Sequence, residues 1–325
     1  MQKLVKDMLQ GDFYALSRLM TMAEDNSDEL PEIMQEIDRY SGNSYRIGIT
    51  GPPGCGKSTL IGKLTTKIRE QGATVGIIAC DPSSPFSGGA LLGDRIRLQS
   101  HFLDNGVFIR SMATRGKIGG LSRKIYVIAR LLDSFGKDFI IIETVGVGQT
   151  EVDIYGIADT TILVLTPMVG DYIQAMKAGV MEIADIFIIN KTDIGEADVI
   201  AEDIASVLAR RRKPGDWKPF ILKTQAKNDV GIKEIDEAIK SHRKFLNETG
   251  LASQRREQSR KQEFLEIIKE KVLDQLTKLL GEKEHFEAYL RKIEKGEMNP
   301  YRACDGILGD KRIWEALFSK VSSHS

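Results

Sequence analysis

The stretch GITGPPGCGKST, residues 48–59, decides how this chain folds. It matches the spacing G-x-x-x-x-G-K-[ST] and ends in Lys57, Ser58 and a threonine. An apolar run (45–50) precedes it, and a run of helix-forming residues (58–72) follows it. Glycines let the backbone N–H groups of such a loop turn towards phosphate oxygens, and the first turn of the next helix adds the positive end of its dipole. The stretch therefore predicts a strand, a phosphate-binding loop and a helix in succession.

Short apolar runs continue along the chain and alternate with segments of helical length. The seven runs are YRIGIT (45–50), ATVGIIAC (73–80), GVFIR (106–110), DFIIIET (138–144), TTILVLT (160–166), DIFIIN (185–190) and KPFILKT (218–224). Continuous apolar runs of this length are typical of strands that are buried on both faces of a parallel sheet and joined by right-handed crossovers. We therefore predict an α/β fold for residues 41–245, a three-layer, mostly parallel sheet of the P-loop NTPase type.

Helical patterns flank this region on both sides. Residues 1–40 have apolar positions at helical spacing and predict a small N-terminal helical extension. Strand-like runs stop after residue 245, so residues 246–325 predict a C-terminal helical region, with one long helix over 252–280 and a second over 282–295. The apolar stripe of the long helix consists of Phe264, Ile268, Val272, Leu276 and Leu279. A stripe of this kind needs a covering surface, either the chain's own sheet domain or another molecule.

Composition narrows the class of protein. The chain has 46 Lys and Arg residues against 46 Asp and Glu residues, which removes the electrostatic argument for a nucleic-acid-binding protein. Cys55, Cys80 and Cys304 lie far apart and support neither a disulfide framework nor a C-x-x-C metal site, as expected in a reducing compartment. No apolar run approaches the roughly 20 residues that span a bilayer, and the N-terminus lacks the apolar core of a signal peptide. We expect a cytoplasmic protein whose partners include neither membrane nor nucleic acid.

The phosphate loop predicts a site for a nucleoside triphosphate and Mg²⁺. Lys57 is placed to reach the β- and γ-phosphates, and the hydroxyl of Ser58 is placed to ligate the metal. The predicted nucleotide contacts in this loop are Gly51, Pro52, Pro53, Gly54, Cys55, Gly56, Lys57, Ser58 and Thr59. An ordinary glycine-rich turn is the simpler alternative, but the full motif between a strand and a helix argues against it.

A second motif identifies the base. The stretch IFIINKTD, residues 186–193, carries N-K-x-D directly after an apolar strand. A carboxylate accepts two hydrogen bonds from the N1–H and amino groups of guanine, and adenine lacks this pair of donors. The motif therefore favours GTP over ATP. The predicted base contacts are Asn190, Lys191, Asp193 and, in the later stretch KTQAKND, Gln225 and Ala226.

Acidic residues predict the metal site. Asp81 ends the strand that follows the phosphate-loop helix, Asp94 lies further along the chain, and Glu143 ends another strand. Carboxylates that converge near a triphosphate need a cation to neutralise them, and Mg²⁺ prefers oxygen ligands. Together with Ser58, these three acids are the predicted Mg²⁺ ligands.

Six stretches, in this order, resemble the MeaB/ArgK family of G proteins. They are GPPGCGKST, DPSSPFSGGALLGDR, RSMATRGKIGGLS, ETVGVGQTEVD, GDYIQAMKAGVMEIADIFIINKTD and NPYRACDG. The likeness covers nearly all of residues 41–245 and continues more faintly into the tail. The family belongs to the branch of P-loop GTPases that includes metallochaperones and signal-recognition proteins. Two positions depart from its usual pattern, Pro52 in place of alanine and Cys55 in place of valine.

The resemblance implies a Mg²⁺-dependent GTPase that hydrolyses GTP to GDP and phosphate. It further implies a chaperone for an adenosylcobalamin-dependent acyl-CoA mutase, typically methylmalonyl-CoA mutase, which gates cofactor loading and protects or reactivates the mutase. Cobalamin would be bound by that partner. The likeness also implies a homodimer formed through residues 246–325. It leaves open which acyl-CoA mutase is served.

The resemblance also implies roles for particular residues. The implied catalytic residues are Lys57, Glu143 and Lys177. Glu143 would organise Mg²⁺ and water, and Gly146 would lie in a loop able to move when the γ-phosphate leaves. Lys177, in the stretch 168–179, would stabilise charge on the transferred phosphoryl group, as an arginine finger does.

Three other hypotheses stay open. A metal-insertion GTPase would be expected to show a Cys/His cluster, but the histidines are scattered at 101, 242, 285 and 324. A kinase or ATPase linked to basic-amino-acid transport, the older label of this family, would need a phospho-acceptor site, and N-K-x-D argues against ATP. A scaffold that binds GTP without hydrolysing it is disfavoured by the presence of Lys57, Asp81, Asp94 and Glu143.

Overall fold

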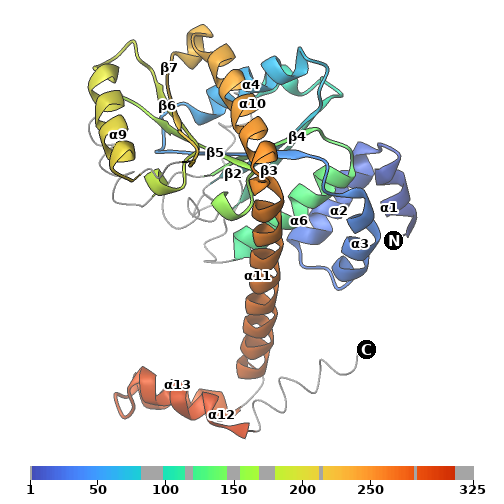
Figure 1. Ribbon diagram of the computed structural model, residues 1–325. Helices are drawn as coiled ribbons and strands as arrows, with labels where there is room; N and C mark the ends of the chain where they lie inside the picture. The colour runs from blue at the N-terminus through green and yellow to red at the C-terminus, as the bar shows by residue number, and fades with distance from the viewer. Residues whose placement is uncertain are drawn as a thin grey trace. The chain divides into compact units, whose positions relative to one another are not determined.

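The computed structural model describes seven stretches of the chain, shown in Figure 1. They are residues 2–81, 98–113, 120–144, 154–167, 180–211, 215–281 and 284–311. The chain divides into two compact units, Met1–Gln262 and Glu263–Ser325. The first unit contains the whole sheet and the first turns of the long C-terminal helix.

A seven-stranded sheet forms the centre of the first unit (Figure 1). The order of its strands is β3-β2-β4-β1-β5-β6-β7. Its strands are β1 (Tyr45–Thr50), β2 (Val75–Asp81), β3 (Val107–Ala113), β4 (Phe139–Glu143), β5 (Thr160–Leu165), β6 (Ile186–Asn190) and β7 (Phe220–Thr224). All six strand pairings are parallel. Each strand lies within or overlaps one of the seven apolar runs, so the predicted parallel α/β fold is confirmed.

Helices cover both faces of the sheet. Successive strand residues point to opposite sides, so each face presents apolar side chains to its own layer of helices. On one face, α4 (Lys57–Arg69) and α10 (Ile232–Glu248) pack on side chains such as Ile141. On the other face, α6 (Gly120–Ser134) packs on the two residues that flank Ile141 in the sequence of β4. On the same face, α9 (Ala197–Arg211) covers β5 and β6. This arrangement gives three layers.

The predicted N-terminal extension is helical. It consists of α1 (Gln2–Leu9), α2 (Phe13–Glu24), α3 (Leu30–Ile37) and the short 3₁₀ helix η1 (Asp38–Tyr40). Asp12 caps α2, since its side chain accepts hydrogen bonds from the backbone N–H groups of Tyr14 (2.7 Å) and Ala15 (3.2 Å). The apolar faces of these helices share a core with α6.

The C-terminal region is helical as well, with α11 (Leu251–Gly281), α12 (Glu284–Glu294) and α13 (Pro300–Leu308). Three residues of the predicted stripe on α11 are exposed: Phe264 retains 62% of its accessible surface, Ile268 42% and Val272 41%. Leu276 is half-buried, and the side chain of Leu279 lies outside the described part of the chain. In the part of the chain that the structure describes, every helix is too short or too polar to span a bilayer.

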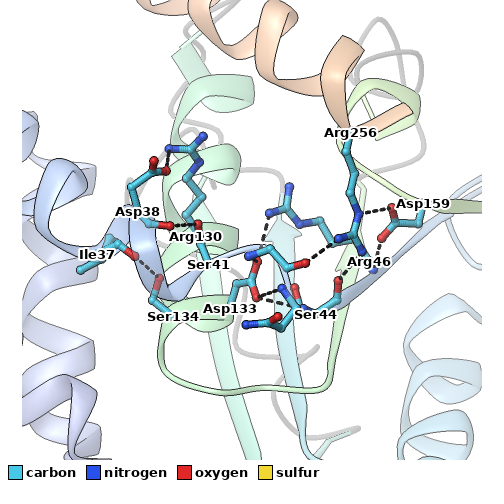
Figure 2. Close-up of polar contacts among 12 residues, drawn as sticks. Ile37, Asp38, Ser41, Ser44, Arg46, Arg130, Asp133, Ser134, Asp159 and Arg256 are labelled. Carbon is cyan, nitrogen blue, oxygen red and sulfur yellow. Dashed lines mark hydrogen bonds and ion pairs between the residues drawn. The ribbon is translucent and has the colours of Figure 1, made fainter. Parts of the chain in front are cut away.

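A polar network at the amino-terminal edge of the sheet fixes the link between η1 and β1 (Figure 2). The carboxylate of Asp133 on α6 accepts hydrogen bonds from the backbone N–H groups of Gly42 (2.7 Å), Asn43 (3.0 Å) and Ser44 (2.9 Å). Arg256 on α11 donates to the carbonyl groups of Gly42 and Ser44. The backbone N–H groups of this link are therefore held by α6, and its carbonyl groups are held by α11.

A buried ionic cluster lies at the same edge, at the start of β6. The guanidinium of Arg255 donates to both carboxylate oxygens of Asp185, at 2.8 and 3.0 Å, and Asp185 is only 5% exposed. His242 on α10 places Nε2 3.3 Å from this carboxylate and Nδ1 2.8 Å from the hydroxyl of Thr160. Burial lowers the pKa of His242 to about 4, so its ring is neutral near neutral pH. The start of α11 thus completes the polar core of the first unit.

Candidate nucleotide-binding site

The phosphate loop connects β1 to α4 at the carboxyl-terminal edge of the sheet. Gly51 has a φ of 143°, and a Cβ atom there would lie 2.0 Å from the carbonyl oxygen of Val164 on β5. Gly56 has a φ of 99°, and a Cβ atom there would lie 2.3 Å from Nδ2 of Asn190 on β6. Only glycine fits at these positions, because the loop is pressed against the ends of β5 and β6.

The carbonyl groups of this loop are held by three side chains. Nζ of Lys57 donates to the carbonyl oxygens of Gly51 (2.6 Å) and Pro52 (3.1 Å). Asn190 donates to the carbonyl of Cys55 (2.8 Å), and Lys191 donates to that of Gly54 (2.7 Å). Lys57 is buried, and its two carbonyl contacts keep the ammonium group along the loop that the motif predicts to hold phosphate. Residues of two distant motifs therefore define one loop conformation.

The predicted metal ligands Ser58 and Glu143 lie together. The Ser58 hydroxyl, on the first turn of α4, is 3.0 Å from Oε1 of Glu143 at the end of β4, and both residues are buried. Glu143 pairs in register with Ala79 on β2. Asp81, two positions further along β2, therefore has its backbone at the same edge of the sheet. The structure thus brings the Ser58 hydroxyl and the Glu143 carboxylate together beside the phosphate loop.

The N-K-x-D motif forms the turn after β6. Oδ1 of Asn190 accepts hydrogen bonds from the Thr224 hydroxyl and from the N–H of Ala226, both at 3.0 Å. Lys191 has a left-handed backbone with a φ of 60°, and Asp193 is exposed. Asn190 therefore joins the phosphate loop to β7 and to the loop after β7. We expect it to position the site, although the sequence pattern groups it with the base contacts.

The loop after β7, residues 225–230, is closed on itself. The backbones of Gln225 and Val230 form an antiparallel bridge, and the side chain of Asn228 donates to that of Gln225 at 3.0 Å. Ala226 is buried, and its N–H is bound to Asn190. The ion pair between Lys63 on α4 and Asp229 in this loop was not predicted from the sequence, because neither residue is among the predicted contacts.

Several predicted residues lie outside the described part of the chain. They are Asp94, Gly146, Lys177 and, for its side chain, Asp81. Their predicted roles stay predictions. The described residues that the structure does bring together come from β1, α4, β4, β6 and the loop after β7.

A parallel sheet with a phosphate loop between β1 and α4, and with N-K-x-D at the end of β6, defines a P-loop GTPase. The family model described as "Methylmalonyl Co-A mutase-associated GTPase MeaB" matches residues 16–280. The chain belongs to this family, and it is a GTPase.

Individual relatives agree with this assignment. A putative GTPase of Pyrococcus abyssi is 45% identical over 312 residues, which cover 94% of this chain and 95% of that protein. The GTPase ArgK of Escherichia coli is 33% identical over 298 residues, with 89% and 88% of the two chains covered. A solved structure described as a LAO/AO transport system kinase superposes with a TM-score of 0.68 at 26% identity, and 95% and 96% of the chains are covered. The likeness extends over nearly the whole chain.

Proposed function

We propose that this GTPase is a Mg²⁺-dependent chaperone for an adenosylcobalamin-dependent acyl-CoA mutase of the methylmalonyl-CoA mutase type. The observation that carries the proposal is the family match over residues 16–280, because the family is described by its association with that mutase. The chaperone would gate cofactor loading and protect or reactivate the mutase. Cobalamin would be bound by the mutase, and the complex would be cytoplasmic.

The geometry of the site supports nucleotide binding with Mg²⁺. The Ser58 hydroxyl and the Glu143 carboxylate supply the hard oxygen donors that Mg²⁺ prefers, and they lie 3.0 Å apart beside the phosphate loop. We propose that Ser58, Glu143, Asp81 and Asp94 hold the ion directly or through water. Bound Mg²⁺ would neutralise charge on the phosphates. Lys57 would give up its carbonyl contacts to bind the β- and γ-phosphates.

The base would be held by the turn after β6 and by the loop after β7. Asp193 is exposed and placed after the strand end, where it would accept the two hydrogen bonds of guanine. Lys191, with its Nζ bound to the Gly54 carbonyl, would line the same pocket together with Gln225 and Ala226. The remaining contacts would come from residues 51–59 of the phosphate loop.

Hydrolysis would depend on two further residues. We propose that Lys177 stabilises the charge that develops on the γ-phosphoryl group and that Gly146 lies in a loop that moves when this group leaves. Both proposals rest on the motifs that these residues share with the family.

The exposed stripe on α11 supports a homodimer. Phe264, Ile268 and Val272 are spaced four residues apart and so lie on one face of the helix. A contiguous apolar face of this kind is typical of a protein–protein interface. We propose that a second copy covers it in a C2 arrangement, since a two-fold contact uses the same face of both chains.

Two alternatives would use the same fold, a GTPase for metal insertion and a transport-linked kinase. The solved relative with the TM-score of 0.68 is described as a transport system kinase. The pairing of N-K-x-D with the phosphate loop favours a guanine nucleotide over ATP. The family description favours a mutase-associated GTPase over both alternatives.

The test is GTP turnover with Mg²⁺, measured alone and with purified methylmalonyl-CoA mutase, with ATP in parallel. We expect slow intrinsic hydrolysis, a marked acceleration by the mutase that is confined to GTP, and loss of this acceleration in Lys177→Ala. Absence of acceleration by methylmalonyl-CoA mutase and related acyl-CoA mutases would overturn the chaperone proposal and point to a different client.

A further inference from the structure

An ion pair joins two elements that the sequence motifs treat separately. Nζ of Lys63 on α4 lies 2.6 Å from Oδ2 of Asp229 in the loop after β7. The two residues are 166 positions apart in the sequence. The Lys63 side chain is 36% exposed and that of Asp229 is 63% exposed. The pair therefore lies at the surface, outside both the phosphate loop and N-K-x-D.

The loop that carries Asp229 is fixed on its other side by the base motif. Oδ1 of Asn190 accepts a hydrogen bond from the N–H of Ala226 at 3.0 Å. Asp229 has a left-handed backbone with a φ of 60°, and its N–H donates to the carbonyl of Ala226. The two attachments thus act on the two arms of one closed loop, Asn190 at its beginning and Lys63 at its end.

The helix that carries Lys63 begins inside the phosphate loop. Lys57 and Ser58 are its first two residues. Thr59, a predicted nucleotide contact, is four residues before Lys63, so the two side chains share one face of α4. The Lys63–Asp229 pair therefore links the wall of the base pocket to the helix that holds the phosphates. A nucleotide that contacts both elements is retained longer when they cannot separate.

We propose that the Lys63–Asp229 ion pair positions loop 225–230 against α4 and thereby lengthens the lifetime of the bound guanine nucleotide. This inference rests on the proposed nucleotide site. Both residues are positioning residues, because neither belongs to the predicted set of nucleotide contacts. Since the pair is exposed, its effect is modest and weakens at high salt.

The experiment measures release of a fluorescent GDP analogue from the full-length protein, chased with excess GDP, without any mutase. The variants are Lys63→Met, Asp229→Asn and the double variant. Asparagine suits position 229 because it tolerates a positive φ. Lys67→Met is the matched control: Lys67 lies on the same helix, and its ion pair with Glu70 (2.9 Å) has similar exposure, at 37% and 55%. This control pair does not involve the loop.

We expect each single variant to release the GDP analogue about two- to five-fold faster than the unsubstituted protein, the range that corresponds to an exposed ion pair. The double variant should release it no faster than either single variant, high salt should remove the differences, and Lys67→Met should have no effect. The GTP turnover number at saturation should change little.

Unchanged release in both single variants would overturn the inference, as would additive effects in the double variant or an equal effect of Lys67→Met. A protein without mutase-stimulated turnover would contradict the proposed function alone, because the release measurement uses no mutase.

Discussion

Ser58 and Glu143 meet across the carboxyl-terminal edge of the sheet, with the serine hydroxyl 3.0 Å from Oε1 of the glutamate. One residue lies in the first turn of α4 and the other ends β4, so the contact joins the phosphate-loop helix to a strand at a sequence separation of 85. A hydroxyl and a carboxylate at this distance form a pair of oxygen donors for a hard cation.

Substitution of Glu143 by Gln should lower Mg²⁺-dependent GTP turnover by about 100-fold, in line with the loss of one preorganised electrostatic group. The amide keeps the shape of the side chain but loses its charge, so GDP binding should change much less. Steady-state phosphate release over a Mg²⁺ titration checks this prediction. Turnover within a few-fold of the unsubstituted protein would show that Glu143 has no part in organising the metal.

Substitution of Asn190 by Ala should weaken binding of GTP and GDP together by about ten-fold or more and should lower thermal stability. The variant loses the donor to Cys55 (2.8 Å) and the acceptor for Thr224 and Ala226 (3.0 Å each), so buried polar groups lose hydrogen bonds. Equilibrium binding of a fluorescent nucleotide and differential scanning calorimetry measure the two effects.

The matched variant Asn190→Asp keeps the acceptor but faces the Cys55 carbonyl with a second oxygen, so it should also bind nucleotide weakly. If Asn190→Asp binds GDP as the unsubstituted protein does, the donor to the phosphate loop is unimportant.

Lys137 should make stability depend on pH in the alkaline range. Its Nζ donates to the Gly106 carbonyl (3.1 Å), and burial lowers the pKa of this lysine from 10.5 to about 8. Between these two values the unfolded chain binds more protons than the folded one, so this group's contribution to the free energy of unfolding rises with pH. At neutral pH the full cost of charging the buried amine opposes folding.

The variant Lys137→Met should remove this dependence. We compare the free energy of unfolding of the unsubstituted protein with that of the variant. The first minus the second should increase by about 2–3 kcal/mol from neutral pH to a pH above the pKa of this lysine in the unfolded chain. Urea unfolding at several pH values measures the difference. A difference that stays constant across this range would mean that Lys137 titrates normally in the folded protein.

Adjacent arginines on α11 should differ in their effect on stability. Arg255→Met leaves Asp185 buried without its guanidinium and should cost about 3–5 kcal/mol. Arg256→Met removes a side chain that is 40% exposed, lies 3.6 Å from Asp159 (Figure 2) and donates to the carbonyl groups of Gly42 and Ser44, and it should cost less, about 1–2 kcal/mol. Urea unfolding of the two variants provides the comparison, and equal losses would contradict it.

The Arg255→Met substitution should also raise the pKa of His242. Burial is the main cause of its low value of about 4, but the positive charge of Arg255 contributes, while Asp185 acts in the opposite direction. An NMR titration of the imidazole in Arg255→Met should therefore show protonation at a higher pH than in the unsubstituted protein.

Substitution of Ile268 by Asp should convert the proposed dimer to a monomer. The residue is 42% exposed on the apolar stripe of α11, where a charge would be buried against the second copy. Sedimentation velocity measures the change, and Lys271→Glu, at an exposed position of the same helix, is the control for added negative charge. A monomeric unsubstituted protein would contradict the dimer directly.

Local patterns determined much of this protein from the sequence alone. The seven strands follow from continuous apolar runs, because strands covered on both faces have no solvent-facing side. The phosphate loop and N-K-x-D are recognisable because their residues are adjacent in the chain and perform chemistry that tolerates few substitutes. The long helix α11 follows from the period of its apolar residues.

Tertiary structure decided which distant residues meet. Asn190 holds Cys55, Thr224 and Ala226, and Lys63 pairs with Asp229, because parallel strands bring their carboxyl ends to one edge whatever their separation in sequence. The polarity of these side chains was visible in the sequence, but their partners were not. A hydrogen bond or ion pair depends on distances of about 3 Å, and only the packing of strands and helices sets such distances between remote parts of a chain.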